Sequence, residues 1–420
     1  MDVCPKSRPL ASLPFDNPYA LLAFFLSPCN NDAATVPLLQ AAEQKTIDWG
    51  SLLYRANLNF CTPLWYVRLR QKGFLPSLPG ELQEYLRLLH QANIERNDAF
   101  RLALEELLRT FQVLGIRTLL LKGAATFCDD LYEDPGARMM GDLDILIEPQ
   151  FSEKARAALL QLGYEQQVRR EQDEIEVFSG NRHHHLPRFN KPGTPVAVEI
   201  HTRTARRQDG RTLPDDLAWE GSEKTTMEGV EAAILSPTHR LLHNTVHALV
   251  PQRNFIRSSI ALTHLAEFAS LSRRYESRLD WEEWFRRGAG QKLGMEFIVY
   301  LSLAHRLMDL PRPDCVPRRF TAGIHLFRIL AAGKQGVADG GSPSTVRARI
   351  IALATRFLLR IYYRVKEPAW MWRNLYYAPD AANFPLRVAF TFRKWARGGI
   401  GTSGRGKKTG EGREETKIIP

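Results

Sequence analysis

Apolar residues recur every three or four positions along much of the first 115 residues, which is the spacing of helices with one buried face. The pattern is clearest in two runs, namely Leu82, Tyr85, Leu86, Leu88 and Leu89, then Leu102, Leu104, Leu107, Leu108 and Phe111. We therefore expect an all-helical N-terminal region over residues 1–115.

The pattern changes after Gly115, where short apolar runs end at turn residues. Gly123 ends the first of these runs, and acidic and apolar residues alternate in the second, as they do in strands. Gly163 is a plausible C-cap for the helix that follows. Strands are predicted at residues 117–122, 142–147, 174–178 and 196–204, and helices at residues 124–131 and 151–162. The strands are thus expected between residues 117 and 204.

Helical periodicity returns at Ser236, which suits an N-cap position, followed by Pro237 at the first helical position. Further helices are predicted near residues 258–272, 280–288, 291–308, 318–332 and 345–365. From about residue 397 the chain has few apolar residues, so we expect a disordered tail. The predicted organisation is an N-terminal helical region (1–115), an α+β core with a mixed sheet (116–230), a C-terminal helical domain (231–396) and a disordered basic tail (397–420).

The composition is that of a globular protein, with 420 residues, 44% apolar residues and 10% aromatics. Five cysteines lie far apart without a Cys-x-x-Cys pair, which argues against a disulfide scaffold and a zinc cluster. The first residues lack the pattern of a secretory leader, and no apolar run is long enough to cross a membrane. We expect a cytoplasmic protein.

The positive charge is concentrated near the C-terminus. Residues 351–420 carry 14 Lys or Arg against 5 Asp or Glu, so they account for +9 of the net charge of +11. Arg356, Arg360, Arg364 and Lys366 recur along a predicted helix that also carries aromatic residues, a pattern that suits weak contact with an anionic membrane or with nucleic acid. We favour the alternative, a helix packed on the domain with a solvated basic face.

Two motifs that suggest ligand binding are rejected. Residues 401–408 resemble a phosphate-binding P-loop, but Lys408 stands where Ser or Thr is required and no strand precedes it. The histidines at 183–185 and at 239, 243 and 247 suggest a metal site, because a spacing of four places imidazoles on one face of a helix. No Glu-x-x-His pair accompanies them, so packing or substrate contact is the favoured role.

The strongest chemical signal is a set of three acidic residues on predicted strands. Side chains alternate faces in a strand, so Asp142 and Asp144 point the same way. Neighbouring carboxylates repel unless a cation compensates, and their oxygens suit Mg²⁺. Glu199 shares its face with His201 on a later strand and would supply a third carboxylate. The alternative is that these acidic residues bind no metal and lie at the solvent-exposed edge of a strand.

Two metal ions held in this way would activate a hydroxyl and stabilise the leaving oxygen in displacement at phosphorus, which indicates a nucleoside triphosphate as the donor. Gly123 lets the backbone approach phosphates, and the amides of the following helix, beginning near Ala124, favour anionic oxygens. Lys122 and Arg138 are candidate phosphate partners, or they simply neutralise acidic neighbours. His201 would orient Glu199 or contact substrate, or serve only in packing.

A family resemblance rests on these residues and on others further along the chain. The matching runs are Leu121-Lys122-Gly123-Ala124-Ala125, Tyr132, Asp134-Pro135-Gly136, Arg138, Asp142-Leu143-Asp144-Ile145-Leu146-Ile147, Leu162-Gly163-Tyr164, Val198-Glu199-Ile200-His201, Leu235-Ser236-Pro237, His243, His247 and Leu279-Asp280-Trp281-Glu282-Glu283-Trp284. Together they resemble the uncharacterised nucleotidyltransferase family of the DNA polymerase β-like superfamily, over roughly residues 35–310.

The resemblance implies a polymerase β-like mixed-sheet core in which Asp142, Asp144 and Glu199 bind metal. It implies an enzyme that uses Mg²⁺ to transfer a nucleoside monophosphate from an NTP such as ATP to a hydroxyl on a small molecule, a protein or an RNA, with release of pyrophosphate. We assign nucleotide binding to Lys122, Gly123, Ala124, Arg138 and His201.

Two residues depart from the expected pattern. Ala124 stands where the superfamily usually has Ser or Gly, and Glu199 stands where the family usually has Asp. They support an alternative hypothesis, a catalytically inactive protein that retains the fold and binds a nucleotide or a partner, docked through its basic C-terminal region.

Overall fold

The computed structural model describes residues 17–29, 32–129, 131–167, 185–205, 210–250 and 254–334. These residues all belong to one compact unit, which spans Met1–Tyr362. Several sequence predictions lie outside the described residues. They are the strand at 174–178, the helix at 345–365, His183, His184, the basic C-terminal region and the tail.

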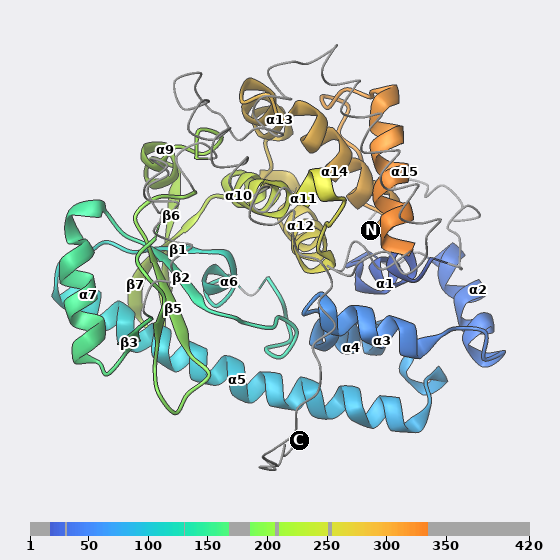
Figure 1. Cartoon of the computed structure of the whole chain (residues 1–420), viewed down its shortest axis with the longest axis horizontal. Coiled ribbons are helices and arrows are strands. Elements are labelled where there is room, and N and C mark those ends of the chain that lie inside the picture. The colour runs from blue at the N-terminus through green and yellow to red at the C-terminus, as the bar shows by residue number, and fades with distance from the viewer. Residues whose placement is uncertain are drawn as a thin grey trace, which may run out of the picture. The chain divides into compact units, whose positions relative to one another are not determined.

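A seven-stranded mixed sheet forms the centre of the α+β part, with strand order β3-β4-β5-β2-β1-β7-β6 (Figure 1). The strands are β1 (Leu119–Leu121), β2 (Leu143–Leu146), β3 (Glu165–Gln166), β4 (Phe189–Asn190), β5 (Ala197–His201), β6 (Ser222–Met227) and β7 (Val230–Leu235). Strand β1 pairs antiparallel with β2 and parallel with β7, and β2 pairs parallel with β5. The predicted α+β class with a mixed sheet is confirmed.

The hairpin of β6 and β7 was not predicted, and the expectation that the strands end at residue 204 is wrong. Glu228 and Gly229, at the turn, have φ angles of +48° and +75°, which is the conformation of a tight two-residue hairpin turn. Strand β7 then lies beside β1 in the middle of the sheet. The sheet therefore extends to Leu235, beyond the expected end of the core at residue 230.

The helices are α1 (Pro18–Leu26), α2 (Asp32–Glu43), α3 (Trp49–Leu58), α4 (Thr62–Gln71), α5 (Gly80–Val113), α6 (Lys122–Ala125), α7 (Ser152–Gln161), α9 (Asp215–Glu220), α10 (Pro237–Leu249), α11 (Asn254–Arg257), α12 (Leu262–Arg274), α13 (Trp281–Gly290), α14 (Gly294–Leu307) and α15 (Phe320–Lys334). The helix predicted at residues 124–131 is only the single turn α6. The helices predicted near 237, 258, 280, 291 and 318 are confirmed as α10, α12, α13, α14 and α15.

The two faces of the sheet carry different side chains because residues alternate along each strand. One face contributes Leu120, Ile145 and Ile200 to a large apolar core that also contains residues of α5 and α7. The other face carries Leu119, Leu121 and Leu146, which pack with Leu213, Ala218 and Leu235. The polar residues Asp144, Glu199 and His201 belong to this second face, since their strand neighbours point into the first core.

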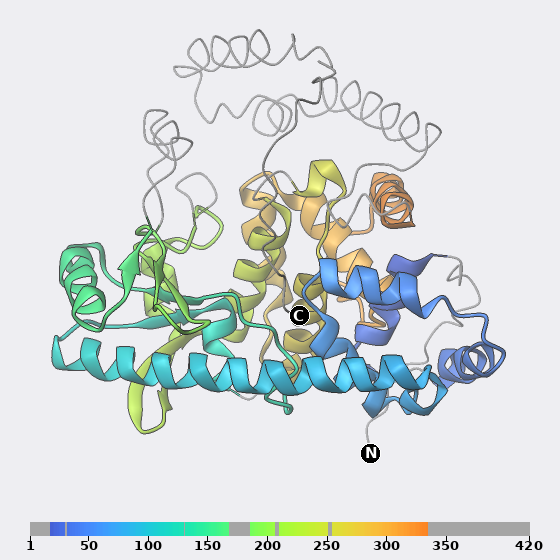
Figure 2. The same cartoon turned by 60° about the horizontal axis from the view of Figure 1, so that its bottom comes forward.

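Helix α5 is 34 residues long and packs against α4 near its start and against β7 and α7 near its end (Figure 2). Along its buried side, Asn93 donates to the carbonyl of Gly136, and Asn97 donates to the carbonyls of Pro135 and Arg138. Because these amides fix the loop between β1 and β2, α5 determines how the chain enters the strand that carries Asp144.

The N-terminal helices share a core with the C-terminal helices. Helix α1 packs against α3, α4, α12, α14 and α15. The Asn17 side chain, which caps α1, donates to the carbonyl of Leu330, and the Tyr19 hydroxyl donates to the carbonyl of Ile260. None of the helices in the described part of the chain combines the length and the apolar character that a membrane span requires.

Candidate metal centre

Asp144, Glu199 and His201 form a cluster in which a ligand atom of each lies within 4.8 Å of the others. Strands β2 and β5 run parallel with Asp144 opposite Glu199 and Leu146 opposite His201. The register, together with the alternation of faces, brings side chains 57 positions apart into contact. Two carboxylates and one imidazole thus converge on the second face of the sheet.

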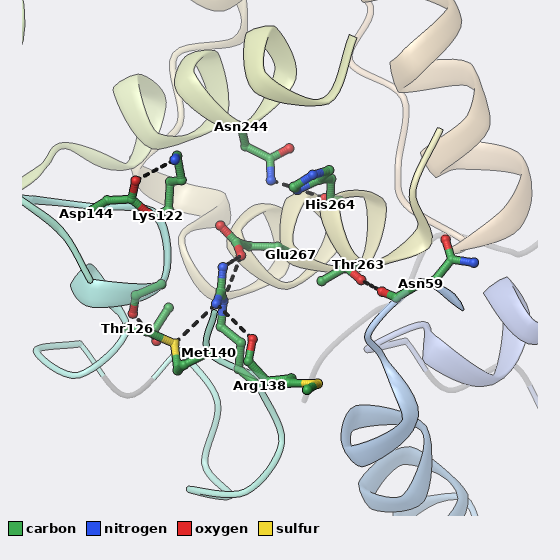
Figure 3. Close-up of polar contacts among 12 residues, drawn as sticks. Asn59, Lys122, Thr126, Arg138, Met140, Asp144, Asn244, Thr263, His264 and Glu267 are labelled. Atoms are coloured by element: carbon green, nitrogen blue, oxygen red, sulfur yellow. Dashed lines mark hydrogen bonds and ion pairs between the residues drawn. The ribbon is translucent and has the colours of Figure 1, made fainter. Parts of the chain in front are cut away.

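Asp144 is the most deeply buried acid of this cluster, with only 2% of its surface exposed. Its Oδ1 accepts a hydrogen bond from Lys122 Nζ at 2.5 Å, the contact shown in Figure 3, and lies 2.7 Å from His201 Nε2. Burial alone would raise the pKa of Asp144, but the Lys122 ammonium and the His201 hydrogen bond outweigh it and hold the pKa well below its usual value. Asp144 is therefore a stable carboxylate.

Asp142 stands immediately before β2 and has a different environment. Its side chain is 29% exposed, and its Oδ2 lies 3.5 Å from Arg188 Nη1. Burial, followed by repulsion from Asp144 and Glu199, raises the pKa of Asp142 to about 6. The charge of Asp142 therefore interacts with the charges of Asp144 and Glu199, although Asp142 does not belong to the group of residues whose ligand atoms lie within 4.8 Å of one another.

Lys122 links β1 to α6 and has a φ angle of +47°, an uncommon conformation for a residue with a side chain. Burial would lower the pKa of Lys122, but the charge of Asp144 outweighs it and the pKa is raised. The ammonium therefore stays protonated at neutral pH. It supplies the positive charge that a buried carboxylate requires.

The remaining predicted nucleotide-binding residues lie around α6. Gly123 and Ala124 are both buried, and Ala124 belongs to the main apolar core. A Cβ atom at Gly123 would lie 2.7 Å from Met140 Sδ and would also collide with the Arg138 guanidinium. A side chain at Gly123 would therefore force Arg138 and Met140 to move.

Arg138 is bound to an acid that the sequence analysis did not identify. Its Nε and Nη2 atoms each lie 3.0 Å from Glu267 Oε2 on α12, and Nη1 contacts Met140 Sδ (Figure 3). The pair joins the β1–β2 loop to the C-terminal helices. Glu267 was missed because nothing in its helical context distinguishes it from a surface acid, although it follows His264 by three residues on one helix face.

A small polar pocket adjoins the cluster, with Lys122 in its wall. The other lining residues are Leu120, Ala125, Arg138, Leu235, Arg240, His243, Asn244, His247, His264 and Glu267. They come from β1 and α6, from the loop between α6 and β2, from the end of β7 and from helices α10 and α12. The histidine spacing on α10 was noted in the sequence, whereas Arg240, Asn244 and His264 were not singled out.

Comparison with protein families gives one match. The sequence model described as "uncharacterised nucleotidyltransferase" matches residues 45–309, which is more than half of the chain. The chain belongs to this family. No curated protein and no solved structure matches it.

The part of the chain that this family matches extends from α3 to α14, so it contains the whole sheet, the Asp144 cluster and the polar pocket. The two carboxylates of the cluster suit a divalent cation, because carboxylate oxygens are preferred by Mg²⁺ and Mn²⁺. These oxygen donors therefore fit a metal ion of the kind the resemblance implies.

Proposed function

We propose that this chain is a Mg²⁺-dependent nucleotidyltransferase with a polymerase β-like core. It transfers a nucleoside monophosphate from an NTP to a hydroxyl-bearing acceptor and releases pyrophosphate. The observation that carries the proposal is the convergence of Asp144, Glu199 and His201 from adjacent parallel strands inside the region matched by the nucleotidyltransferase family.

Asp142, Asp144 and Glu199 would hold the metal ions, which supply charge stabilisation for the acceptor oxygen and for the leaving phosphate. His201 orients the buried carboxylate of Asp144, since Nε2 lies 2.7 Å from Oδ1 but 3.7 Å from Glu199 Oε2. Lys122 provides a protonated ammonium beside the same carboxylate, where the negative charge of a triphosphate requires a partner.

Both departures, that of Ala124 from the superfamily pattern and that of Glu199 from the family pattern, are compatible with this proposal. Glu199 stands directly opposite Asp144, and its carboxylate belongs to the close cluster in spite of the longer side chain. Ala124 is fully buried in the main core, so its side chain supports α6. The basic C-terminal region lies outside the described residues, and its contact with an anionic membrane or nucleic acid stays a prediction, as does the cytoplasmic location.

The proposal is tested by calorimetry of each NTP with and without Mg²⁺, for the wild-type protein and for Asp144→Asn. We expect Mg²⁺-dependent binding of at least one NTP by the wild type and its loss in Asp144→Asn. Asp98→Asn, an exposed acid on α5, serves as the matched control and should bind normally. Binding that is independent of both Mg²⁺ and Asp144 would contradict the proposal.

A second measurement separates an enzyme from a binding protein that retains the fold. The protein is incubated with γ-labelled NTP, Mg²⁺ and a cell extract, and the release of labelled pyrophosphate is followed. The enzyme hypothesis predicts release that the Asp144→Asn change abolishes. Tight NTP binding without any release would favour the non-catalytic alternative.

A further inference from the structure

The polar pocket beside the cluster is electrically balanced, in spite of the three cations in its wall. Lys122 is paired with Asp144, Arg138 with Glu267, and Arg240 with Asp129. A metal ion at Asp144 would release Lys122 toward a triphosphate, but an anion at Arg138 or Arg240 would have to break a buried ion pair, which is costly. The pocket therefore suits an uncharged, hydrogen-bonding group better than a phosphate.

Two imidazoles in the pocket have unused hydrogen-bonding capacity. The rings of His247 and His264 lie 4.9 Å apart and nearly perpendicular to each other. Within the part of the chain that the structure describes, neither ring makes a hydrogen bond or an ion pair. The side chain of Asn244, in contrast, has a partner for both its nitrogen and its oxygen, because it donates to the carbonyl of His264 (Figure 3) and accepts from the Tyr300 hydroxyl.

Both imidazoles are neutral at physiological pH. Burial, assisted by the charges of Arg138 and Lys122, lowers the pKa of His264 to about 4, and burial with Lys122 lowers the pKa of His247 well below its usual value. A neutral imidazole offers one N–H donor and one nitrogen acceptor. A hydroxyl group donates one hydrogen bond and also accepts one. It can therefore donate to the acceptor nitrogen of one neutral imidazole and accept from the N–H of the other.

The size of the pocket limits what can enter. The space open to the centres of water-sized groups is about 30 Å³, which corresponds to about two such groups. The hydroxyl end of a small alcohol fits this space.

We propose that this pocket admits the hydroxyl end of a small uncharged alcohol, which is the acceptor of the transferred nucleotide, and that His247 and His264 hold that hydroxyl. The inference rests on the proposed nucleotidyltransferase function. Lys122 is common to the pocket wall and to the Asp144 cluster, so a hydroxyl held there lies next to the candidate metal centre.

The test uses the full-length protein with each α-labelled NTP, Mg²⁺ and three fractions of a cell extract, namely a small-molecule ultrafiltrate, protein and RNA. We expect label in the ultrafiltrate fraction. His247→Leu and His264→Leu should reduce that transfer about tenfold through the lost hydrogen bonds, by raising KM for the acceptor fraction while KM for the NTP is unchanged. His247→Gln, which keeps a donor and an acceptor, should retain most of the transfer.

His305→Leu changes a histidine that is exposed on α14 and is the matched control. Thermal denaturation shows which variants fold. If His264→Leu does not fold, the comparison of His247→Leu with His247→Gln still tests the inference. The inference would be overturned by label in protein or RNA, or by unchanged transfer in the folded leucine variants. It would also be overturned if these variants lost NTP binding as much as they lost transfer. Mg²⁺-dependent NTP binding without a labelled small molecule overturns only the acceptor assignment, whereas absence of that binding overturns the proposed function itself.

Discussion

Asp142 and Asp144 are two residues apart and have opposite pKa shifts. Asp144 has an ammonium and an imidazole at hydrogen-bond distance, which outweigh its burial. The nearest cation to Asp142 is the more distant Arg188, so burial and repulsion prevail. The identity of the partners, rather than the acidic residue itself, thus determines which carboxylate is charged near neutral pH.

We expect Asp142→Asn to stabilise the metal-free protein at pH 8, by roughly half as much at pH 5, and hardly at all below about pH 3.5. The pKa of Asp142 is raised to about 6 from its ordinary 3.8, so between pH 3.8 and pH 6 the folded state binds a proton that the unfolded state has lost. As the pH rises through this range, the ionised carboxylate increasingly disfavours folding. Allowing for partial exposure, the gain is about 1 kcal/mol. Urea unfolding with a chelator measures it, and a gain of equal size at pH 5 would contradict the explanation.

Lys122→Met should destabilise the metal-free protein by about 3 kcal/mol, because it leaves the buried Asp144 carboxylate without its cation. Mn²⁺ should then raise the melting temperature of the variant more than that of the wild type, since the metal no longer competes with the ammonium. The matched control is Lys191→Met, which breaks an exposed pair with Glu106 and should cost less than about 1 kcal/mol. Equal Mn²⁺ effects in the variant and the wild type would argue against cation competition.

The sequence allowed the convergence of Asp144 and Glu199 to be predicted, because strand alternation and a family resemblance are both local patterns. It did not reveal the contact of Arg138 with Glu267, which joins residues 129 positions apart. Such a pairing depends on how helix α12 packs against the β1–β2 loop, and no periodicity encodes that packing.

At the scale of elements, α5 acts on the site through the loop that it holds. Asn97 is buried, and its amide donates to the carbonyls of Pro135 and Arg138. Backbone carbonyls that are buried without a hydrogen-bond partner destabilise the folded state. The helix therefore supplies the donors that the loop itself does not provide. The polar residues on the buried side of α5 therefore have a positioning role that helical periodicity alone does not predict.

We expect Asn97→Ala to lower the free energy of unfolding by about 1–3 kcal/mol, since the Pro135 carbonyl loses its donor and the Arg138 carbonyl keeps only Asn93. It should also weaken Mg²⁺-dependent NTP binding, because the loop leads into the strand that carries Asp144. Asp98→Ala changes the exposed neighbour on α5 and should alter neither quantity. Denaturant unfolding and calorimetry measure the two effects, and destabilisation with unchanged NTP affinity would show that the loop does not influence the site.

The order of helices and strands was largely predictable from periodicity, but the β6–β7 hairpin was not. Strand β6 has the sequence Ser-Glu-Lys-Thr-Thr-Met and lies at the edge of the sheet, where most of its side chains are at least partly accessible. An edge strand of this kind lacks the apolar alternation that identifies buried strands. The Glu228-Gly229 turn was the one local signal available.

For the molecule as a whole, buried histidines determine the response to acid. Burial lowers the pKa of His243 and His264 to about 4 and that of His325 to about 3, and His247 is shifted in the same direction. In the unfolded chain these groups bind protons below about pH 6.5. Stability is therefore complete above that pH and is lost as the pH falls toward 4.

We expect the free energy of unfolding to decrease by several kcal/mol between pH 7 and pH 4.5. This decrease is roughly the sum of the contributions of the four buried histidines, each of which binds a proton more readily in the unfolded chain. Urea unfolding across this range provides the measurement. His325→Gln should flatten the dependence, whereas His305→Gln, at an exposed position, should not. A profile that is equally steep in both variants would assign the acid sensitivity to other groups.

The contact of α1 with the C-terminal helices has a consequence for biosynthesis. Asn17 reaches its partner Leu330 only after 313 further residues have been polymerised. At the usual rate of translation this takes roughly half a minute. During that interval the apolar side of α1, including Phe25 and Leu26, has no α15 to cover it. Ribosome-associated chaperones are therefore expected to bind this segment while the chain is still being made.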